Sequence, residues 1–178
     1  WEGITYYKKE VKNYGCFTKG YKDYSKYYIL YKTVRKLRPQ YTLECGSGIT
    51  TMIIALALKE NGAGRFVSMD ELAQFGNTTA RIVKEAGLAV EMRISPSLED
   101  TYGGIRGNRY QTTPDYPYDF VFIDGPVTNS VDLDAFSVLH KNPRARILVD
   151  CRAKTVRALQ IKYKGSFNHL VNLGYVNW

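Results

Sequence analysis

Short apolar runs alternate along the chain with longer segments whose apolar residues recur at helical spacing. The apolar runs predict strands at residues 41–45, 65–70, 88–94, 118–124 and 145–150, and a final strand or short hairpin at 167–178. The helical spacings predict helices at residues 50–60, 72–86, 130–139 and 153–163. This alternation is typical of strands joined by helical crossovers. We therefore predict an α/β fold with a doubly wound, mostly parallel sheet of six or seven strands and helices on both faces.

Residues 1–40 differ from the rest of the chain in charge and in aromatic content. They hold ten Lys or Arg against three acids, and nine of the fifteen tyrosines lie within residues 1–41. Helical spacing connects five of their apolar residues, which are Tyr27, Leu30, Tyr31, Val34 and Leu37. A helix is therefore expected to begin near Asp23 or Ser25 and to end before Pro39. We interpret residues 1–40 as a basic, Tyr-rich N-terminal cap and residues 41–178 as one globular unit.

Composition narrows the class of protein. The chain has 178 residues, of which 44% are hydrophobic and 24% are charged. This length and composition are typical of one folded domain and exclude a disordered protein. The net charge of +8 is concentrated in both ends, so the basic termini are candidates for nucleic-acid binding. The longest apolar run, residues 52–58, is too short for a membrane span. Three cysteines without metal or disulfide spacing indicate a reducing, cytoplasmic protein, and a start at Trp1 suggests a trimmed chain or an excised domain.

A connection of unusual length separates the third and fourth predicted strands. Residues 95–117 contain three prolines and three glycines, and they follow a strand at the edge where open α/β sheets bind ligands. Such connections are commonly lids or binding loops. Arg106 and Arg109, flanked by Tyr102 and Tyr110, are candidates to close over an anionic substrate, because guanidinium groups pair well with carboxylate or phosphate. The alternative is that both arginines only order the loop by pairing with nearby acids, which are Glu99, Asp100 and Asp115.

The sharpest motif is E-C-G-S-G-I-T-T at residues 44–51, between a predicted strand and a predicted helix. Its glycines allow a tight turn and a close approach of a ligand to the backbone, so a side chain at Gly46 is expected to occupy ligand space. A dinucleotide motif would carry a third glycine where Thr51 stands. Glu44 would repel a pyrophosphate, whereas it suits a cationic ligand such as S-adenosylmethionine (SAM).

An acidic residue follows at the distance that a nucleoside site requires. Asp70 ends the second predicted strand, 22 residues after Gly48. In nucleoside-binding sheets an acid at this place accepts hydrogen bonds from the ribose hydroxyls. Glu71 is the neighbouring candidate for the same role.

The motifs E-C-G-S-G-I-T-T, G-R-F-V-S-M-D, Y-D-F-V-F-I-D-G and R-I-L-V-D together resemble class I SAM-dependent methyltransferases, in particular the branch of small-molecule O-methyltransferases. The resemblance covers about residues 41–152 and implies a Rossmann-like, seven-stranded sheet. It further implies that five residues of the glycine motif line the cofactor, namely Glu44, Gly46, Ser47, Gly48 and Thr50. The family's Gly-Asp pair is replaced by Ser95 and Pro96, so adenine contacts are expected from Ser97, Leu98 or the backbone.

The same resemblance places the methyl acceptor at the end of the fourth predicted strand. Asp124 is there the candidate to line the cofactor and to orient or deprotonate an acceptor hydroxyl. Metal-dependent members carry an Asp at this strand end and Asp-Asn at the next. Asp124 and Asp150 match, but Cys151 replaces the Asn, so we expect no metal and keep a Mg²⁺ site at these two acids as the weaker alternative.

We therefore expect methyl transfer from SAM to an oxygen of a small acceptor. If Arg106 and Arg109 contact this acceptor, it can be an anion. One alternative is an enzyme that acts on RNA or protein through the basic termini. Another is a degenerate methyltransferase fold that binds partners without catalysis. The sequence leaves the oligomeric state open.

Overall fold

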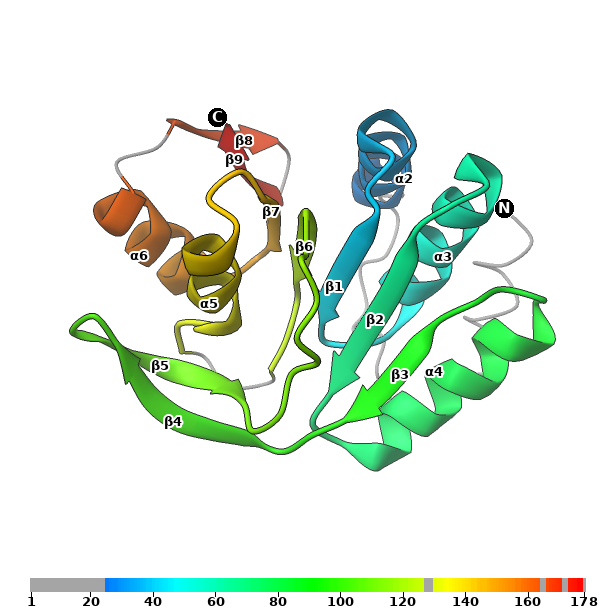
Figure 1. Ribbon diagram of the computed structural model, residues 1–178, viewed down its shortest axis with the longest axis horizontal. Coiled ribbons are helices and arrows are strands. Elements are labelled where there is room, and N and C mark those ends of the chain that lie inside the picture. The colour runs from blue at the N-terminus through cyan, green and yellow to red at the C-terminus, as the bar shows by residue number, and fades with distance from the viewer. Residues whose placement is uncertain (1–24, 127–129, 164–165, 171–172, 178) are drawn as a thin grey trace.

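The structure is a computed structural model that describes residues 25–126, 130–163, 166–170 and 173–177. Seven strands form one sheet in the order β3-β2-β1-β6-β7-β9-β8 (Figure 1). Their bounds are β1 Tyr41–Cys45, β2 Arg65–Asp70, β3 Glu91–Ile94, β6 Phe120–Ile123, β7 Arg146–Asp150, β8 Ser166–Leu170 and β9 Leu173–Asn177. The first five of these run parallel, whereas β9 pairs antiparallel with β7 and with β8. The mostly parallel, doubly wound sheet is therefore confirmed, and the closing segment is a hairpin.

Five described helices cover the two faces of the sheet. Their bounds are α2 Ser25–Leu37, α3 Ile49–Asn61, α4 Ala73–Glu85, α5 Asp134–Lys141 and α6 Ala153–Tyr163. Residues of α2, α3 and α4 share one apolar core, and residues of α5 and α6 share the other (Figure 1). None of the described helices has the length and apolarity needed to cross a bilayer.

Strand β6 shows how the sequence builds both cores at once. Phe120 and Phe122 face the core under α3, whereas Val121 and Ile123 face the core under α5. All four are buried, because alternate side chains of a strand point to opposite faces and both faces are covered. Full burial of such a side chain contributes about 1.5–3 kcal/mol, which explains why this strand lies at the centre of the sheet.

The long connection is folded rather than irregular. Residues 97–110 form an antiparallel hairpin of β4 Ser97–Tyr102 and β5 Ile105–Tyr110. Gly103 and Gly104 both have positive φ values, 53° and 83°, as a two-residue hairpin turn of the primed type requires. The amide of Asn108 also donates to the carbonyl of Val131 (2.8 Å), which ties the hairpin to the segment before α5. The connection therefore has regular structure of its own, and its role as a lid or binding loop stays a prediction.

The two largest differences between predicted and observed boundaries have local causes. Strand β3 begins at Glu91 instead of residue 88, because the Leu88 amide still bonds back to the Val83 carbonyl (3.0 Å) and ends α4. Helix α5 begins at Asp134 instead of residue 130, because the Leu133 amide donates to the Asn108 carbonyl of the hairpin (2.8 Å).

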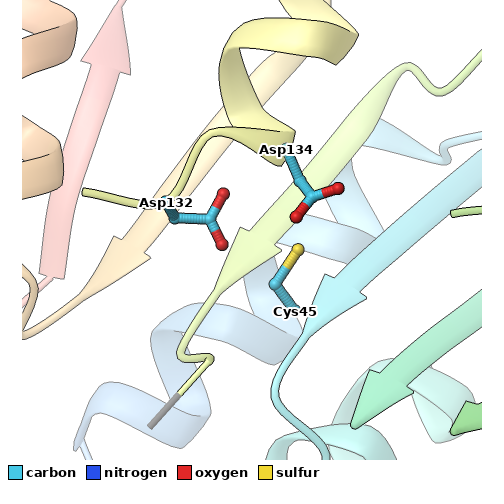
Figure 2. Close-up of side chains that lie close together, drawn as sticks. All are labelled: Cys45, Asp132 and Asp134. Atoms are coloured by element: carbon cyan, nitrogen blue, oxygen red, sulfur yellow. The ribbon is translucent and has the colours of Figure 1, made fainter. Parts of the chain in front are cut away.

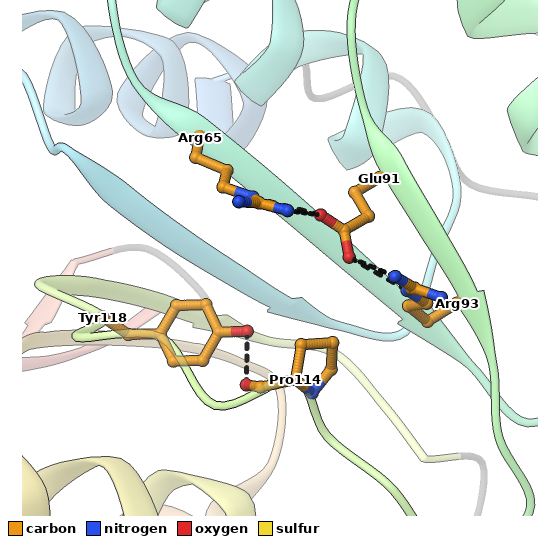
Figure 3. Close-up of polar contacts among 5 residues, drawn as sticks. All are labelled: Arg65, Glu91, Arg93, Pro114 and Tyr118. Carbon is orange, nitrogen blue, oxygen red and sulfur yellow. Dashed lines mark hydrogen bonds and ion pairs between the residues drawn. The ribbon is translucent and has the colours of Figure 1, made fainter.

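Polar contacts hold the edge of the sheet and the return of the chain into β6 (Figure 3). The Glu91 carboxylate, on the edge strand β3, forms ion pairs with the guanidinium groups of Arg65 of β2 at 2.7 Å and of Arg93 at 2.6 Å. Before β6, the Tyr118 hydroxyl donates to the Pro114 carbonyl at 2.9 Å. These contacts position the sheet ends and lie apart from the glycine turn.

The predicted N-terminal helix is confirmed as α2, which packs on α3 through buried residues that include Tyr27, Leu30 and Val34. The remainder of the predicted cap, residues 1–24, lies outside the described residues. Its division from residues 41–178 as a separate unit stays a prediction.

Candidate functional site

The carboxyl ends of the parallel strands β1, β2, β6 and β7 meet at one edge of the sheet. Every strand-end acid singled out from the sequence therefore reaches that edge. Asp70 ends β2, Asp124 follows β6, and Asp150 ends β7. The glycine turn lies among them, between β1 and the start of α3. Open parallel sheets bind ligands at this edge, so we take it as the candidate site.

Gly46 is required by the fold itself. It has φ +93°, and its amide donates to the Met69 carbonyl at 2.9 Å. A Cβ atom at Gly46 would lie 2.6 Å from the amide nitrogen of Gly125. The sequence predicted that a side chain at Gly46 would collide only with the ligand. The structure adds that such a side chain would collide with the backbone after β6. Gly48 caps α3, where its amide donates to the Thr51 hydroxyl at 2.9 Å.

Asp70 and the glycine turn are in direct contact, as their spacing predicted. One Asp70 carboxylate oxygen accepts the amide of Ser47 at 3.2 Å and its hydroxyl at 2.5 Å. The other accepts the amide of Leu72 at 2.9 Å. Asp70 is 7% exposed. A ribose that uses this carboxylate would therefore share it with Ser47 or displace the serine hydroxyl.

The candidates for the ribose and the adenine lie beside each other. Ser97, at the start of β4, donates its hydroxyl to the Glu71 carboxylate. Leu98 follows it and pairs across the hairpin with Arg109. The hairpin therefore begins next to the acid pair at the end of β2, where the sequence predicted the nucleoside.

Glu44 lies inside the protein. Its carboxylate accepts three hydroxyl groups, from Thr50 at 2.6 Å, Thr51 at 2.5 Å and Ser68 at 2.6 Å. Burial raises the pKa of Glu44 to about 7, although the three hydroxyls oppose this rise. Glu44 and Thr50 thus brace the turn from within, and their predicted contact with the cofactor stays a prediction.

Charged groups from three elements meet at the ends of β6 and β7. The Lys26 ammonium at the start of α2 lies 2.7 Å from a carboxylate oxygen of Asp150. Asp150 is 2% exposed, and its other oxygen has no hydrogen-bond partner among the described residues. Arg152 donates to the main-chain carbonyls of Asp124 and Pro126. This arrangement places an ammonium beside Asp150, one of the two acids of the metal alternative.

Asp124 has an exposed side chain at this position. Although part of the side chain is accessible, protein atoms displace much of the water around the carboxyl, and this loss together with repulsion by Asp150 raises its pKa to about 7. Lys26 and Arg152 act in the opposite direction. A carboxyl with a pKa near neutrality can take up a proton and release it again, as a general base must.

The arginines of the hairpin form ion pairs with the opposite strand. Arg106 lies 2.5 Å from Glu99, and Arg109 lies 2.6 Å from Asp100. Both pairs were expected under the alternative in which the arginines only order the loop. All four side chains remain at least 37% exposed, and the predicted substrate contact stays a prediction.

The two tyrosines of the hairpin point to different places. Tyr102 packs against Phe136 of α5, with ring centroids 5.7 Å apart. Tyr110 is buried, and its hydroxyl lies 3.4 Å from the Met69 carbonyl, the acceptor that Gly46 also uses. Tyr110 therefore supports the glycine turn from beneath, whereas Tyr102 anchors the hairpin to α5.

A buried thiol and two acids lie behind the same edge (Figure 2). Ligand atoms of Cys45, Asp132 and Asp134 lie within 4.8 Å of one another. Asp132 accepts the Ala135 amide at 3.1 Å, and Asp134 accepts the Tyr110 amide at 3.0 Å. Burial raises the pKa of Cys45 well above its usual range, so the thiol keeps its proton. The two acids thus hold the start of α5 and the end of β5, although one Asp132 oxygen has no hydrogen-bond partner among the described residues.

Sequence reasoning missed Lys26, Arg152 and Ser68 as members of this edge. Lys26 and Arg152 belong to the two basic ends of the chain, whose charges were considered only together. Ser68 lies within an apolar strand. No local motif signals any of them. The carboxylates of Glu44, Asp70 and Asp124 lie around the turn, and such acceptors suit a ligand with a sulfonium and an ammonium better than a pyrophosphate.

The strand order, the glycine turn and the acid at the end of β2 define a class I SAM-dependent methyltransferase fold. The family model described as "Methyltransferase domain" matches residues 43–150. The chain therefore belongs to the methyltransferase domain family, and it is a SAM-dependent methyltransferase.

Solved structures agree in fold across almost the whole chain. A putative O-methyltransferase from Klebsiella pneumoniae matches with a TM-score of 0.70 and 15% identity over 99% of this chain and 90% of that chain. The O-methyltransferase of Bacillus cereus, solved with S-adenosylhomocysteine (SAH), matches with a TM-score of 0.66 and 15% identity over 99% of this chain and 91% of that chain. TomG of Streptomyces achromogenes, an O-methyltransferase of tomaymycin synthesis solved with SAM, matches with a TM-score of 0.63 and 15% identity. The match covers 100% of this chain and 91% of that chain. No curated protein sequence matches the chain.

Proposed function

We propose that the protein transfers a methyl group from SAM to an oxygen of a small acceptor. The observation that carries the proposal is Asp124, an exposed carboxylate that directly follows β6 and adjoins the glycine turn. The O-methyltransferases among the matched structures support oxygen as the acceptor atom. An accessible base beside the turn is what such a reaction requires from the protein.

We propose that the cofactor lies along the carboxyl ends of β1 and β2. Ser47 and Asp70 would hold the ribose, with Glu71 and Ser97 on the side of the base. Bound SAM supplies a methyl group on a positively charged sulfur, which becomes a neutral thioether when that bond breaks. The many carboxylates at this edge favour a cationic ligand over an anionic one.

Asp124 would orient the acceptor hydroxyl and take its proton. Since its pKa lies at about 7, a substantial fraction of the carboxyl is ionised at neutral pH and can accept that proton. The main contribution of the protein to such a transfer is positioning of the two reactants. Arg152 assists by holding the carbonyls of Asp124 and Pro126, which fixes the backbone that carries the base.

Titration with SAH and a turnover assay test the proposal together. SAH should bind the wild type and Asp124→Asn with similar affinity, as measured by calorimetry. A panel of phenols, alcohols and carboxylic acids, with SAH release as the readout, should give turnover with the wild type and at least about a hundredfold less with the variant.

Two results would contradict the proposal. Absence of SAH binding at any concentration would favour the non-catalytic alternative. Turnover on RNA or protein, together with salt-dependent oligonucleotide binding and none on the small-molecule panel, would favour the macromolecular one.

A further inference from the structure

The buried cluster of Cys45, Asp132 and Asp134 holds two acids without a compensating positive charge. Asp132 is 1% exposed, and one of its oxygens has no hydrogen-bond partner among the described residues. Asp134 is 4% exposed. In the described part of the chain, neither acid forms an ion pair with a lysine or an arginine. Buried carboxylates are costly unless they are paired or bind a metal, so a cation at this place would offset both.

The three side chains point toward one common space (Figure 2). Their ligand atoms, one sulfur and two carboxylate oxygens, lie within 4.8 Å of one another. Two ligand atoms of one tetrahedral zinc ion lie roughly 3.5 Å apart, because each bond is about 2.0–2.3 Å long. Small side-chain rotations would therefore bring all three atoms into range. The Asp132 carboxylate, which carries the unpartnered oxygen, points at the other two groups.

Hydrogen bonds from outside the cluster orient both acids, as they orient the ligands of protein metal sites. Asp132 accepts the Ala135 amide at 3.1 Å with its other oxygen. Asp134 accepts the Tyr110 amide at 3.0 Å and the Thr113 hydroxyl at 2.8 Å, one on each oxygen. A carboxylate oxygen has two lone pairs, so each of these oxygens can still bind a metal ion.

The cluster is accessible from one side. Asp134 and Thr113 line a cavity of about 410 Å³, and so do Asp115 and Lys141. The side chains of Asp115 and Lys141 are more than half exposed, so the cavity opens to solvent. A metal ion can therefore approach the cluster past Asp134.

We propose that Cys45, Asp132 and Asp134 form a structural site for one Zn²⁺ ion. A thiolate ligand favours zinc over magnesium or calcium, which prefer oxygen ligands, and water would complete the tetrahedron. On binding, a sulfur–zinc bond forms and the thiol proton leaves to solvent, without any change of oxidation state. The ion would connect the end of β1 to the start of α5 beneath the glycine turn. The site is independent of the proposed methyl transfer, because none of its three residues has a role in that reaction.

Cobalt tests the site, because Co²⁺ replaces zinc in proteins and gives a sulfur-to-metal absorption band only when a thiolate binds it. The double variant Cys16→Ser with Cys151→Ser is the background protein, since Cys45 is then its one cysteine. Refolding from urea with excess Co²⁺ lets a buried site load, and dialysis removes free ion. We expect one Co²⁺ per chain and the band. Cys45→Ser in this background should abolish the band.

Two acid variants in the same background test the other ligands. Asp132→Asn should weaken Co²⁺ and Zn²⁺ binding at least about tenfold, because even loss of a residue that only orients a ligand costs about 10–100-fold. Asp150→Asn is the matched control, since Asp150 is also buried with an unpartnered oxygen but ends β7. It should leave the band unchanged. Zn²⁺ should remove the band and raise the melting temperature of the background protein increasingly with concentration, but not that of Asp132→Asn.

Three results would overturn the proposal. Absence of the band in the refolded background protein would mean that both acids avoid their charge by keeping a proton, since burial raises the pKa of Asp132 and of Asp134. Bound Co²⁺ without the band would place the ion at other carboxylates. A band of equal strength and affinity in Asp132→Asn would exclude that acid as a ligand. A cooperative urea transition shows that each variant is folded, and if Cys45→Ser fails this check the comparison of Asp132→Asn with Asp150→Asn decides.

Discussion

Replacement of Glu44 by glutamine should flatten the pH dependence of stability. Glu44 is fully buried, and burial raises its pKa from the ordinary 4.5 to about 7. Between these two values the folded protein retains a proton that the unfolded chain has released. Stability from this group is therefore complete below about pH 4.5 and is lost as the pH rises through 7. Glutamine keeps the shape of the side chain but cannot titrate.

The size of the effect follows from the two pKa values. One pKa unit corresponds to about 1.36 kcal/mol, so the rise from 4.5 to about 7 makes a difference on the order of 3 kcal/mol. Because other buried acids also titrate, the useful quantity is the stability of the wild type minus that of Glu44→Gln. That difference should fall by about 3 kcal/mol between pH 4.5 and 7.5.

Urea unfolding at several pH values measures this difference. Glu99→Gln, on the exposed surface of β4, is the matched control and should follow the slope of the wild type. A parallel course of wild type and Glu44→Gln would refute the reasoning. It would mean that the hydroxyls of Thr50, Thr51 and Ser68 keep the carboxylate ionised in spite of burial.

Four further substitutions test the rest of the site. Asp70→Ala should weaken SAH binding at least tenfold by calorimetry, because a hydrogen bond to a charged group contributes about 1.5–3 kcal/mol; an unchanged Kd would move the ribose role elsewhere. Arg106→Ala and Arg109→Ala should each lower the melting temperature only slightly, because their ion pairs are exposed; a raised acceptor KM with unchanged SAH affinity and melting would place them at the substrate. Gly46→Val should lower the melting temperature strongly, because its Cβ would lie 2.6 Å from the Gly125 amide; a stable variant that only loses SAH binding would contradict the contact.

The strands and helices that the sequence predicted are those whose apolar pattern matches their burial. Strand β6 is apolar at consecutive positions because both faces are covered, and α2 carries apolar residues at helical spacing because one side packs on α3. The glycine turn and Asp70 were predicted together because their distance along the chain is set by one helix and one strand. Pattern and spacing are local properties, so they can be read from the sequence.

The hairpin of β4 and β5 was missed although a local signal was present. Gly103 and Gly104 stand between two six-residue segments that could pair, and two adjacent glycines favour the primed turns of tight hairpins. The prolines at both ends of the connection, Pro96 and Pro114, outweighed that signal and indicated a loop. The ion pairs of the hairpin contain the same arginines that suggested a substrate lid. Charge alone did not distinguish a partner on the next strand from a ligand.

The contact between Lys26 and Asp150 joins residues 124 positions apart, and its cause is the direction of α2. The helix ends just before β1 begins, so its last residues lie at the amino edge of the sheet. Thirteen helical residues rise about 20 Å, slightly more than the length of a five-residue strand. The start of α2 therefore reaches the opposite edge, where the acids gather. A basic residue in the first turn of this helix thus reaches the carboxyl edge of the sheet because of the length and direction of α2, so this helix contributes to the candidate site as well as to the core.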